Sequence, residues 1–423
     1  MSRITRRRFT GFLVAGATAA LGSSRVVARA APKVVVVGGG FGGATAAKYL
    51  RRFDAGIQVT LIAPQTVFVT CPFSNTVIAG MNGIEKITRG YAGLRRAGVE
   101  IVHDEAIVID AAARTIRLKG GAALEFDRAV VAPGIGFRWD AVEGYDEATA
   151  ERIPHAWQGG QQTLLLRRQL EAMRDGGTFL ISPPVNPFRC PPGTGERISL
   201  VAHYLKRHKP RSKILVLDPK ERFSKQALFE EGWSKLYPGM IEYRSAGDDG
   251  VVRRVDADNL TLHTDFGEER GDVINFIPAQ RASDIALTSG LADATGWCPV
   301  DHRTFESTLV PTVHVLGDAA LAAPMPKSGF AASTQAKVAA EAIVALLRDR
   351  APGEPKFVNT CYSLVAPDYG VSIAMVYGYR DGKIVKVKGS GGLSPVGASQ
   401  QVRRLEADYA DGWYKSISRD IWG

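Results

Sequence analysis

The chain has 423 residues, of which 45% are hydrophobic and 23% are charged. That length exceeds what one hydrophobic core usually serves, so two or three domains are expected, and the hydrophobic content excludes a mainly disordered chain. The formal net charge is +10, but residues 1–30 hold six arginines and no acid, which leaves +4 for the rest. So small an excess does not indicate nucleic-acid binding.

The N-terminus predicts an export signal. Residues 5–9 (TRRRF) precede a short apolar run at 12–21, and residues 28–30 (ARA) have the small-x-small pattern of a cleavage site. A membrane anchor is the alternative, although the apolar run is about half of the roughly 20 residues that a spanning helix needs. We expect residues 1–30 to be a twin-arginine signal peptide, and the mature chain to be periplasmic with no membrane span.

The first predicted unit of the mature chain is a strand, a glycine turn and a helix. Residues 33–37 (KVVVV) are typical of a buried parallel strand, and residues 44–50 read as a helix. Between them, Gly38, Gly40 and Gly43 have the G-x-G-x-x-G spacing that lets a backbone approach a pyrophosphate at a helix N-terminus. A tight turn without a ligand is the alternative, but the strand-turn-helix order favours a dinucleotide.

The next strand departs from that fingerprint. Residues 58–62 (QVTLI) end at Ala63, where the fingerprint expects an acid that binds the adenosine ribose. The loop that follows carries Cys71 and, in this type of fold, passes beside the ligand. The missing acid costs the ligand one hydrogen bond.

A second segment has the same strand-helix-strand order but lacks the glycine turn. Strands at 177–181 and 213–218 flank a helix at 198–206, and the loop at 182–192 contains five prolines around Cys190. Prolines lack the backbone donors that a phosphate-binding loop requires. This unit therefore has the strand and helix order of a pyridine-nucleotide domain but lacks its phosphate-binding loop. The electrons must come from a donor other than NAD(P)H.

A later segment completes the first nucleotide-binding unit. Residues 312–316 form a strand that ends in Gly317-Asp318, and an alanine-rich helix extends to about Leu347. In two-domain flavoproteins such a Gly-Asp binds the ribityl chain of FAD, and the next helix directs its positive end at the flavin ring. We expect FAD contacts here; the alternative for Asp318 is a cap at a strand end. The expected contact residues are Asp318, Lys327, Ser328 and Gly329.

The chain has four cysteines, at positions 71, 190, 298 and 361, and no C-x-x-C or C-x-x-C-H pattern. This spacing argues against a zinc site or a covalent haem, and no metal is expected. Two structural disulfides are one interpretation for an exported chain. The other is a thiol pair able to pass two electrons to a flavin, which the loop positions of Cys71, Cys190 and Cys361 favour.

Together these segments resemble the flavoprotein subunit of flavocytochrome c sulfide dehydrogenase, a relative of sulfide:quinone oxidoreductases and of flavoproteins found with periplasmic sulfur-oxidation systems. The resemblance covers essentially the whole chain after residue 30, and the cysteine-proline loop and the segment 359–363 are its most specific parts. It rests on residues 34–43, 70–75 (TCPFSN), 187–193 (PFRCPPG), 296–301 (GWCPVD), 317–319 (GDA), 325–329 (MPKSG) and 359–363 (NTCYS).

The resemblance implies roles for individual residues. Cys71 would hold FAD covalently, through a thioether to the 8α-methyl, which would also compensate for Ala63. Cys190 and Cys361 would form a redox-active disulfide over the flavin. Glu196 would transfer protons near the sulfide site.

The reaction expected from this resemblance begins when hydrosulfide attacks the disulfide and forms a persulfide. Electrons then pass through FAD, one at a time, to a c-type cytochrome whose haem lies on another chain. Arg189 either lowers the pKa of the neighbouring thiol and attracts hydrosulfide, or is a solvated or phosphate-facing arginine. Cys298 is either structural or near the flavin.

The last third predicts a hairpin, with strands at 371–377 and 383–387 around an Asp-Gly turn, and a helix at 401–421. The expected fold class is α/β, with two Rossmann-like dinucleotide-binding domains of the glutathione-reductase type and a smaller C-terminal α+β domain. The expected segments are a signal peptide (1–30), an FAD-binding domain in two parts (31–155 and 300–350), a second Rossmann-like domain (156–299) and a C-terminal cytochrome-interface domain (351–423).

Three functions follow from different premises. The sequence favours a periplasmic sulfide dehydrogenase that reduces a cytochrome. The enzymatic alternative is a sulfide:quinone oxidoreductase, although the tail lacks the apolar amphipathic helices that would hold such an enzyme at a membrane. The third is a binding role, in which a flavin-dithiol protein docks on a sulfur-carrier protein and reactivates it.

Overall fold

The computed structural model describes residues 30–423, so the predicted signal peptide lies almost wholly outside the described residues. The first sheet is entirely parallel and forms where unbroken β-branched runs predict buried strands. Its order is β20 (Val313–Val315), β9 (Arg128–Val131), β1 (Lys33–Val37), β2 (Gln58–Ile62) and β5 (Glu100–Val102).

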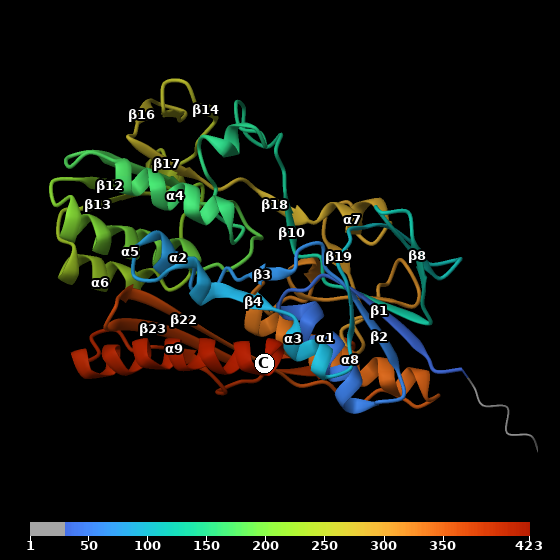
Figure 1. Cartoon of the computed structure of the whole chain (residues 1–423). Helices are drawn as coiled ribbons and strands as arrows, with labels where there is room; N and C mark the ends of the chain where they lie inside the picture. Colours follow the sequence, from blue (N-terminus) through green and yellow to red (C-terminus); the bar gives the residue numbers. More distant parts are fainter. Residues whose placement is uncertain (1–29) are drawn as a thin grey trace, which may run out of the picture. The chain divides into compact units, whose positions relative to one another are not determined.

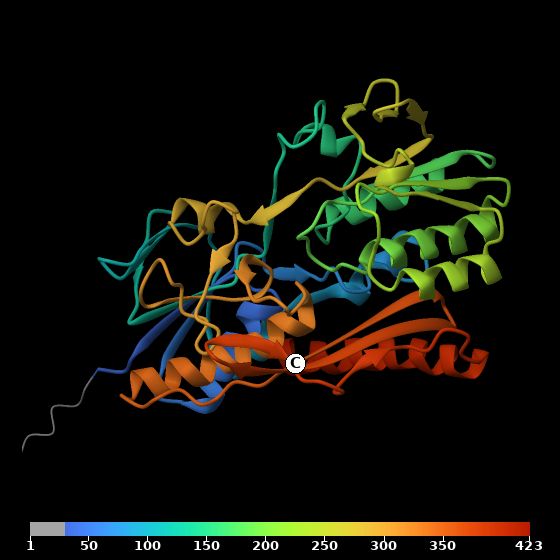
Figure 2. The ribbon, with the colours of Figure 1, turned by 180° about the vertical axis from the view of Figure 1, so that it is seen from behind.

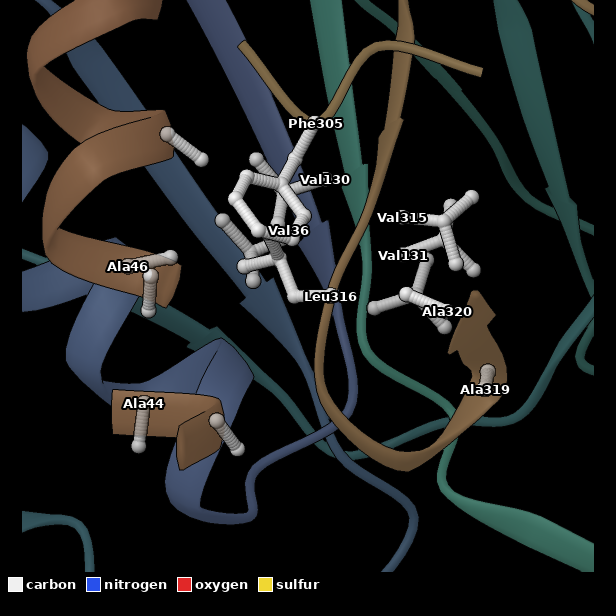
Figure 3. Close-up of a cluster of buried hydrophobic side chains, with 14 of the residues drawn as sticks. Val36, Ala44, Ala46, Val130, Val131, Phe305, Val315, Leu316, Ala319 and Ala320 are labelled. Atoms are coloured by element: carbon white, nitrogen blue, oxygen red, sulfur yellow. The ribbon is translucent and has the colours of Figure 1, made fainter. Parts of the chain in front are cut away.

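Two helices, α1 (Phe41–Phe53) and α8 (Gly329–Leu347), pack against each other beside this sheet. Alanines allow the close approach, and the buried core around Val36, Val130 and Leu316 includes Ala44 of α1 (Figure 3). Strand β20 therefore joins a sheet whose other strands end 182 residues earlier in the chain. This is the discontinuous arrangement that the sequence predicts for the first nucleotide-binding unit.

A second parallel sheet has the order β13 (Ile241–Arg244), β12 (Lys213–Leu217), β11 (Thr178–Ser182) and β17 (Val273–Phe276). It packs with α4 (Gln161–Ala172), α5 (Gly193–His208) and α6 (Gln226–Leu236), drawn in green in Figure 1. Helix α5 begins at Gly193, five residues before the predicted start, because Gly193-Thr194-Gly195 has low helix propensity and hides the first turn from sequence reasoning.

Smaller elements connect these two sheets. Strands β10 (Ile135–Phe137) and β18 (Gln280–Ala282) pair in antiparallel fashion between the two units. The remaining elements are β3 (Val67–Val69) with β4 (Thr88–Gly90), β6 (Ala106–Asp110) with β7 (Thr115–Leu118) and β8 (Ala123–Glu125), β14 (Arg254–Asp256) with β15 (Thr261–His263) and β16 (Glu268–Arg270), β19 (Cys298–Pro299) with β21 (Ala320–Leu321), and the short helices α2 (Ser74–Ile78), α3 (Ala92–Arg96) and α7 (Asp284–Thr288).

The C-terminal third forms the predicted hairpin and helix. Strand β22 (Phe357–Ala366) pairs with β23 (Tyr369–Arg380), which also pairs with β24 (Lys383–Lys386) and β25 (Gly392–Leu393). Helix α9 (Gln400–Trp422) lies along β22 and β23, and α8 contacts β22, as seen from behind in Figure 2.

At its end, α9 reaches the glycine turn of the first unit. The indole Nε1 of Trp422 donates to the Gly39 carbonyl at 3.3 Å, and its ring stacks on Phe68. Tyr414 and Trp422 are buried, whereas Tyr409 is 55% exposed. These three of the four α9 aromatics thus divide between packing against the protein and facing solvent.

Residues 32–423 pack as one compact unit, so the predicted internal domain boundaries stay predictions. Within the described part of the chain, α8 alone has the length and apolar composition of a membrane span, and 61% of its most apolar window is buried inside the protein. It carries Lys337, which pairs with Asp420 of α9 at 2.8 Å. The buried core helix of a soluble protein passes the same test, so this is weak support for a span.

Candidate active site

The glycine turn after β1 leaves a helix N-terminus open to an anion. Gly38 has φ of +101°, a conformation that side chains rarely adopt. A Cβ on Gly43 would lie 1.9 Å from the Gly38 carbonyl oxygen, so only glycine lets α1 approach the turn this closely. Gly40 precedes α1 and supplies no side-chain cap, which leaves the first amides of the helix without a side-chain partner.

Asp318 provides the second half of a dinucleotide site. Its Oδ1 is buried and has no hydrogen-bond partner among the described residues, while Oδ2 lies 3.8 Å from Arg189 Nη1. Burial raises the pKa of this carboxyl. The short helix at 317–319, which contains Asp318, has no side-chain cap at its start. An unpaired buried acceptor of this kind fits a hydroxylated chain such as the ribityl chain of FAD.

The segment before α8 holds this loop in place. Lys327 Nζ donates to the carbonyls of Asp318 at 2.6 Å and Ala320 at 3.0 Å and lies over the Trp297 ring. Burial lowers the pKa of Lys327 to about 8. Ser328 Oγ caps α8 by accepting from the Ala331 amide. Lys327 and Ser328 thus shape the site, and Gly329 begins the helix that faces it.

One cavity brings together three cysteines that are far apart in sequence. Cys71, Cys190 and Cys361 all line it, together with Glu196. The other predicted residues that line it are Ser328 and Gly329. The three fingerprint glycines, Asp318 and Lys327 lie outside its lining, but Arg189 lines it and contacts Asp318. Arg189 therefore links the dinucleotide site to the cysteine cavity.

The loop that holds Cys190 is fixed by backbone bonds. Cys190 has φ of +58°, which costs a non-glycine residue about 1–3 kcal/mol. Its amide donates to the Lys327 carbonyl at 2.8 Å, and its carbonyl accepts from the Gly193 amide at 2.8 Å. The Cys190 side chain is thereby held at the N-terminus of α5, beside the segment that precedes α8.

Cys190 and Cys361 are free thiols in this structure, and they are hydrogen-bonded to each other. That hydrogen bond, supported by the nearby Lys225 ammonium, lowers the pKa of Cys361 to about 7. The pKa of Cys190 is raised well above its usual value, first by the same hydrogen bond and then by burial. The pair is therefore asymmetric, and Cys361 is the one that holds a thiolate near neutral pH.

Glu196 lies in the first turn of α5, beside the thiol pair. Its Oε2 accepts from Asn75 Nδ2 at 2.7 Å, and its Oε1 accepts from the Leu364 amide at 2.9 Å. Burial raises the pKa of this carboxyl despite those two donors. An acid whose pKa is raised by burial beside a thiol pair is a candidate proton carrier.

Sequence reasoning missed three residues that support this cavity. Arg197 is buried, donates to Asn75 Oδ1 at 3.0 Å, and lies over the Trp157 ring. Lys225 is buried and donates to the Cys361 carbonyl at 2.8 Å and Ser363 Oγ at 3.0 Å. Arg197 could have been suspected from its place next to Glu196, but nothing local marks Lys225 or Trp157.

The two remaining predictions concern Arg189 and Cys298. Arg189 is partly buried; its guanidinium donates to the Trp157 carbonyl, and its backbone amide donates to Gln280 Oε1 at 2.8 Å. It is thus not a solvated arginine. Cys298 is fully buried in β19, outside the cavity of the other cysteines, and burial raises its pKa to about 12. That environment fits a structural cysteine.

Comparison with known proteins identifies the family. Residues 163–278 match the central domain of the sulfide dehydrogenase [flavocytochrome c] flavoprotein chain, and residues 353–422 match the flavin-binding domain of flavocytochrome c sulphide dehydrogenase. A sulfide dehydrogenase flavoprotein chain of Chlorobaculum thiosulfatiphilum is 71% identical over 45 residues, which cover 11% of this chain and 94% of that one. The chain belongs to the family of flavocytochrome c sulfide dehydrogenase flavoprotein chains. The predicted resemblance is confirmed.

Other comparisons are more distant. Residues 32–164 match the pyridine nucleotide-disulphide oxidoreductases. The mitochondrial sulfide:quinone oxidoreductase of Mus musculus is 21% identical over 76% of this chain and 72% of its own. The solved structure of the sulfide:quinone oxidoreductase from Aquifex aeolicus has a TM-score of 0.72 at 16% identity, covering 92% of each chain. The predicted fold class is confirmed.

Family membership makes this protein an oxidoreductase that acts on sulfide with FAD as its cofactor. The residues present fit that cofactor. The open amides at the start of α1 suit the pyrophosphate, and the unpaired Oδ1 of Asp318 suits the ribityl chain. The cavity that Cys71 lines lies at the N-terminus of α8, where the flavin ring is expected.

Proposed function

We propose that this chain oxidises hydrosulfide at the Cys190–Cys361 pair and passes the electrons through FAD to a c-type cytochrome on a separate subunit. The observation that carries the proposal is the single cavity lined by Cys71, Cys190, Cys361 and Glu196. When bound, FAD supplies an acceptor that takes two electrons together and returns them one at a time. The name of the family, flavocytochrome c, supports the cytochrome as acceptor.

The thiol pair starts the cycle in its oxidised form, as a disulfide. Hydrosulfide forms a bond to Cys190 Sγ, the Cys190–Cys361 bond breaks, and its electron pair leaves on Cys361 Sγ. Cys361 is the better leaving group because the Lys225 ammonium, which donates to the Cys361 carbonyl, favours a negative charge on that sulfur. The persulfide is therefore assigned to Cys190 and the thiolate to Cys361.

Two buried groups support the charges that this step creates. The Lys225 ammonium, held by the Cys361 carbonyl, lies near the new thiolate and stabilises it. Glu196 takes the proton that the persulfide loses, at a carboxylate oxygen, and burial, which raises the pKa of this carboxyl, favours its protonated form. Lys225 is thus a positioning and charge-stabilising residue, and Glu196 is the proton carrier.

The decisive experiment is an anaerobic titration of the FAD-loaded protein with sulfide. Bleaching of the flavin absorbance, followed by recovery on adding cytochrome c but not a soluble quinone, is expected. Recovery with quinone alone would favour the second candidate, a sulfide:quinone oxidoreductase, which the relatives of that name support. No bleaching by sulfide would overturn both.

We also propose that Cys71 carries FAD through a thioether. The support is the position of Cys71 in the cavity, where its Sγ lies 3.4 Å from the Trp157 carbonyl oxygen. After acid denaturation, the yellow colour should stay with the wild-type polypeptide and leave the Cys71→Ser variant. Colour that leaves both proteins would show a dissociable flavin.

The periplasmic location is a separate proposal that rests on the sequence of residues 5–30. Replacement of Arg6 and Arg7 by lysine should keep the protein in the cytoplasmic fraction of the host cell, whereas the unchanged chain should appear in the periplasmic fraction. An unchanged distribution would rule out the twin-arginine route.

A further inference from the structure

The thiol pair borders two cavities. Cys190 and Cys361 line the cavity already described and also a second one, which Cys71 and Glu196 do not line. The walls of the second cavity are mostly proline and apolar side chains, including Pro191, Pro192, Ile373, Met375 and Tyr377. The two cavities thus meet at the two sulfurs.

The register of the C-terminal hairpin explains how this wall forms. In β22 and β23, Cys361 lies opposite Ile373, and Asn359 lies opposite Met375. Directly paired residues of antiparallel strands project from the same face of the sheet, and every second residue shares that face. The strand register therefore places Cys361, Ile373 and Met375 on one face of the hairpin. Pro191 and Pro192 of the Cys190 loop form a rigid part of the same cavity wall.

The lining of the second cavity contains a basic side chain and no acidic one. Apart from the two thiols and the Tyr377 phenol, Lys386 is its only ionisable side chain, and it is exposed at the end of β24. The first cavity instead carries the Glu196 carboxyl. An apolar pocket with a single cation at its edge suits a polarisable, weakly hydrated anion, which is the chemistry of hydrosulfide and of polysulfide chains.

We propose that this second cavity is the sulfur-binding site: hydrosulfide reaches the Cys190 sulfur through it, guided by Lys386, and the growing chain of sulfane sulfur occupies it. This inference rests on the proposed oxidation of sulfide. It assigns the first cavity to the flavin ring and the second to inorganic sulfur.

The chemistry of growth balances with FAD as the named oxidant. Attack of hydrosulfide on the disulfide gives a Cys190 persulfide and a Cys361 thiolate. Loss of one proton and of two electrons to FAD joins these as a trisulfide, in which one sulfane sulfur lies between the cysteines. A second hydrosulfide then attacks that central sulfur, and Cys361 leaves again as a thiolate. The chain on Cys190 therefore lengthens by one sulfur for each pair of electrons, and it needs room that the flavin does not occupy.

The test compares two variants on the second cavity with a matched surface control. Lys386→Glu reverses the charge at the edge, and Met375→Trp fills the pocket. Lys388→Glu makes the same charge change two residues along, outside the lining. Stopped-flow reduction of the FAD-loaded protein by sulfide is measured for each, with direct reduction by dithionite as the reference that does not need this route.

Lys386→Glu is expected to lower the rate constant for reduction by sulfide about tenfold at low salt, an effect that added salt reduces. Met375→Trp is expected to slow reduction by sulfide and to shorten the sulfur chain recovered by cyanolysis. Lys388→Glu should stay within about twofold of wild type, and dithionite should reduce all proteins alike.

Wild-type rates in both cavity variants would overturn the second cavity as the sulfur site while leaving sulfide oxidation intact. Failure of sulfide to reduce the wild-type protein would instead overturn the proposed function. If Met375→Trp does not fold, Lys386→Glu still decides, because it alters an exposed side chain.

Discussion

The two nucleotide-binding units share one topology and have lost complementary parts of it. The first unit keeps the glycine turn at Gly38 and Gly43 but has Ala63 where an acid would bind the ribose. The second has no glycine turn, yet Asp218 stands at the end of β12, the place that Ala63 has in the first. There Asp218 is buried and bonded to Lys220 Nζ at 2.6 Å.

This contrast shows how one fold serves two purposes. In the first unit, a helix N-terminus with free amides can bind a phosphate. In the second, the loop between β11 and α5 holds Cys190, and the first turn of α5 holds Glu196. Lys220 donates to the Pro184 carbonyl of that loop at 2.8 Å. The second unit thus presents a thiol and a carboxyl at the cavity, where the first unit presents the open amides of a helix N-terminus.

The largest expected effect comes from breaking the buried ion pair of the second unit. Lys220→Met leaves the Asp218 carboxylate without its cation and should lower the free energy of unfolding by about 3 kcal/mol. Urea denaturation measures this. Lys119→Met, on an exposed pair with Glu105, is the control and should leave the midpoint unchanged. An equal midpoint for Lys220→Met would mean that the pair does not hold this loop.

The next largest effect is the loss of folding stability at acid pH, which two buried histidines cause. Burial lowers the pKa of His155, at the junction of the two units, to about 3, and that of His314, in the first unit, to about 4. In the unfolded chain both histidines take up a proton as the pH falls below 6.5, whereas in the folded chain they stay neutral. Their full contribution to the free energy of unfolding is therefore present above pH 6.5 and is lost as the pH falls toward their folded pKa values.

From about pH 7 to about pH 5, each of these histidines should remove about 2 kcal/mol from the free energy of unfolding. His155→Asn should therefore roughly halve the acid sensitivity, measured by urea denaturation at several pH values. The same slope in the variant and the wild type would contradict this account.

A smaller effect tests the glycine turn of the first unit. Gly43→Ala should cost about 2 kcal/mol, because the new Cβ would overlap the Gly38 carbonyl, and it should lower the ratio of flavin to protein. Gly412→Ala in α9 is the matched control, since nothing lies within 4 Å of its new Cβ. Full flavin content in Gly43→Ala would show that the turn does not hold the pyrophosphate.

The smallest effect restores the missing acid. In a Cys71→Ser background, Ala63→Asp should slow FAD dissociation about fivefold, which is the value of roughly one hydrogen bond, about 1 kcal/mol. Flavin fluorescence after dilution follows the release. Faster release would mean that the pocket around Ala63 has been reshaped for a small residue.

Much of the fold follows from patterns within single segments. The strands at 33–37 and 58–62 have their predicted bounds because short apolar runs rich in β-branched residues favour buried strands. The start of α5 escapes this reasoning, since the backbone around Gly193 is fixed by its bond to the Cys190 carbonyl rather than by propensity. Local pattern predicts elements well where burial alone decides them.

Sequence predicts a site residue only where the residue type itself indicates a chemical role. Cysteines and a Gly-Asp step can be recognised in sequence, and the structure brings Cys71, Cys190 and Cys361 to one cavity. Lys225 could not be found this way, because it bonds the carbonyl of a residue 136 positions away. The charges that set the thiol pKa values are a product of tertiary packing.

The bond between Trp422 and Gly39 joins residues 383 positions apart. The turn expected to bind the pyrophosphate is made early in translation, yet its packing partner is among the last residues to leave the ribosome. Strand β20, which completes the same sheet, also emerges after most of the chain. Synthesis must therefore be nearly finished before the flavin site can close, and loading of the cofactor becomes a post-translational event that reports on completion of the whole chain.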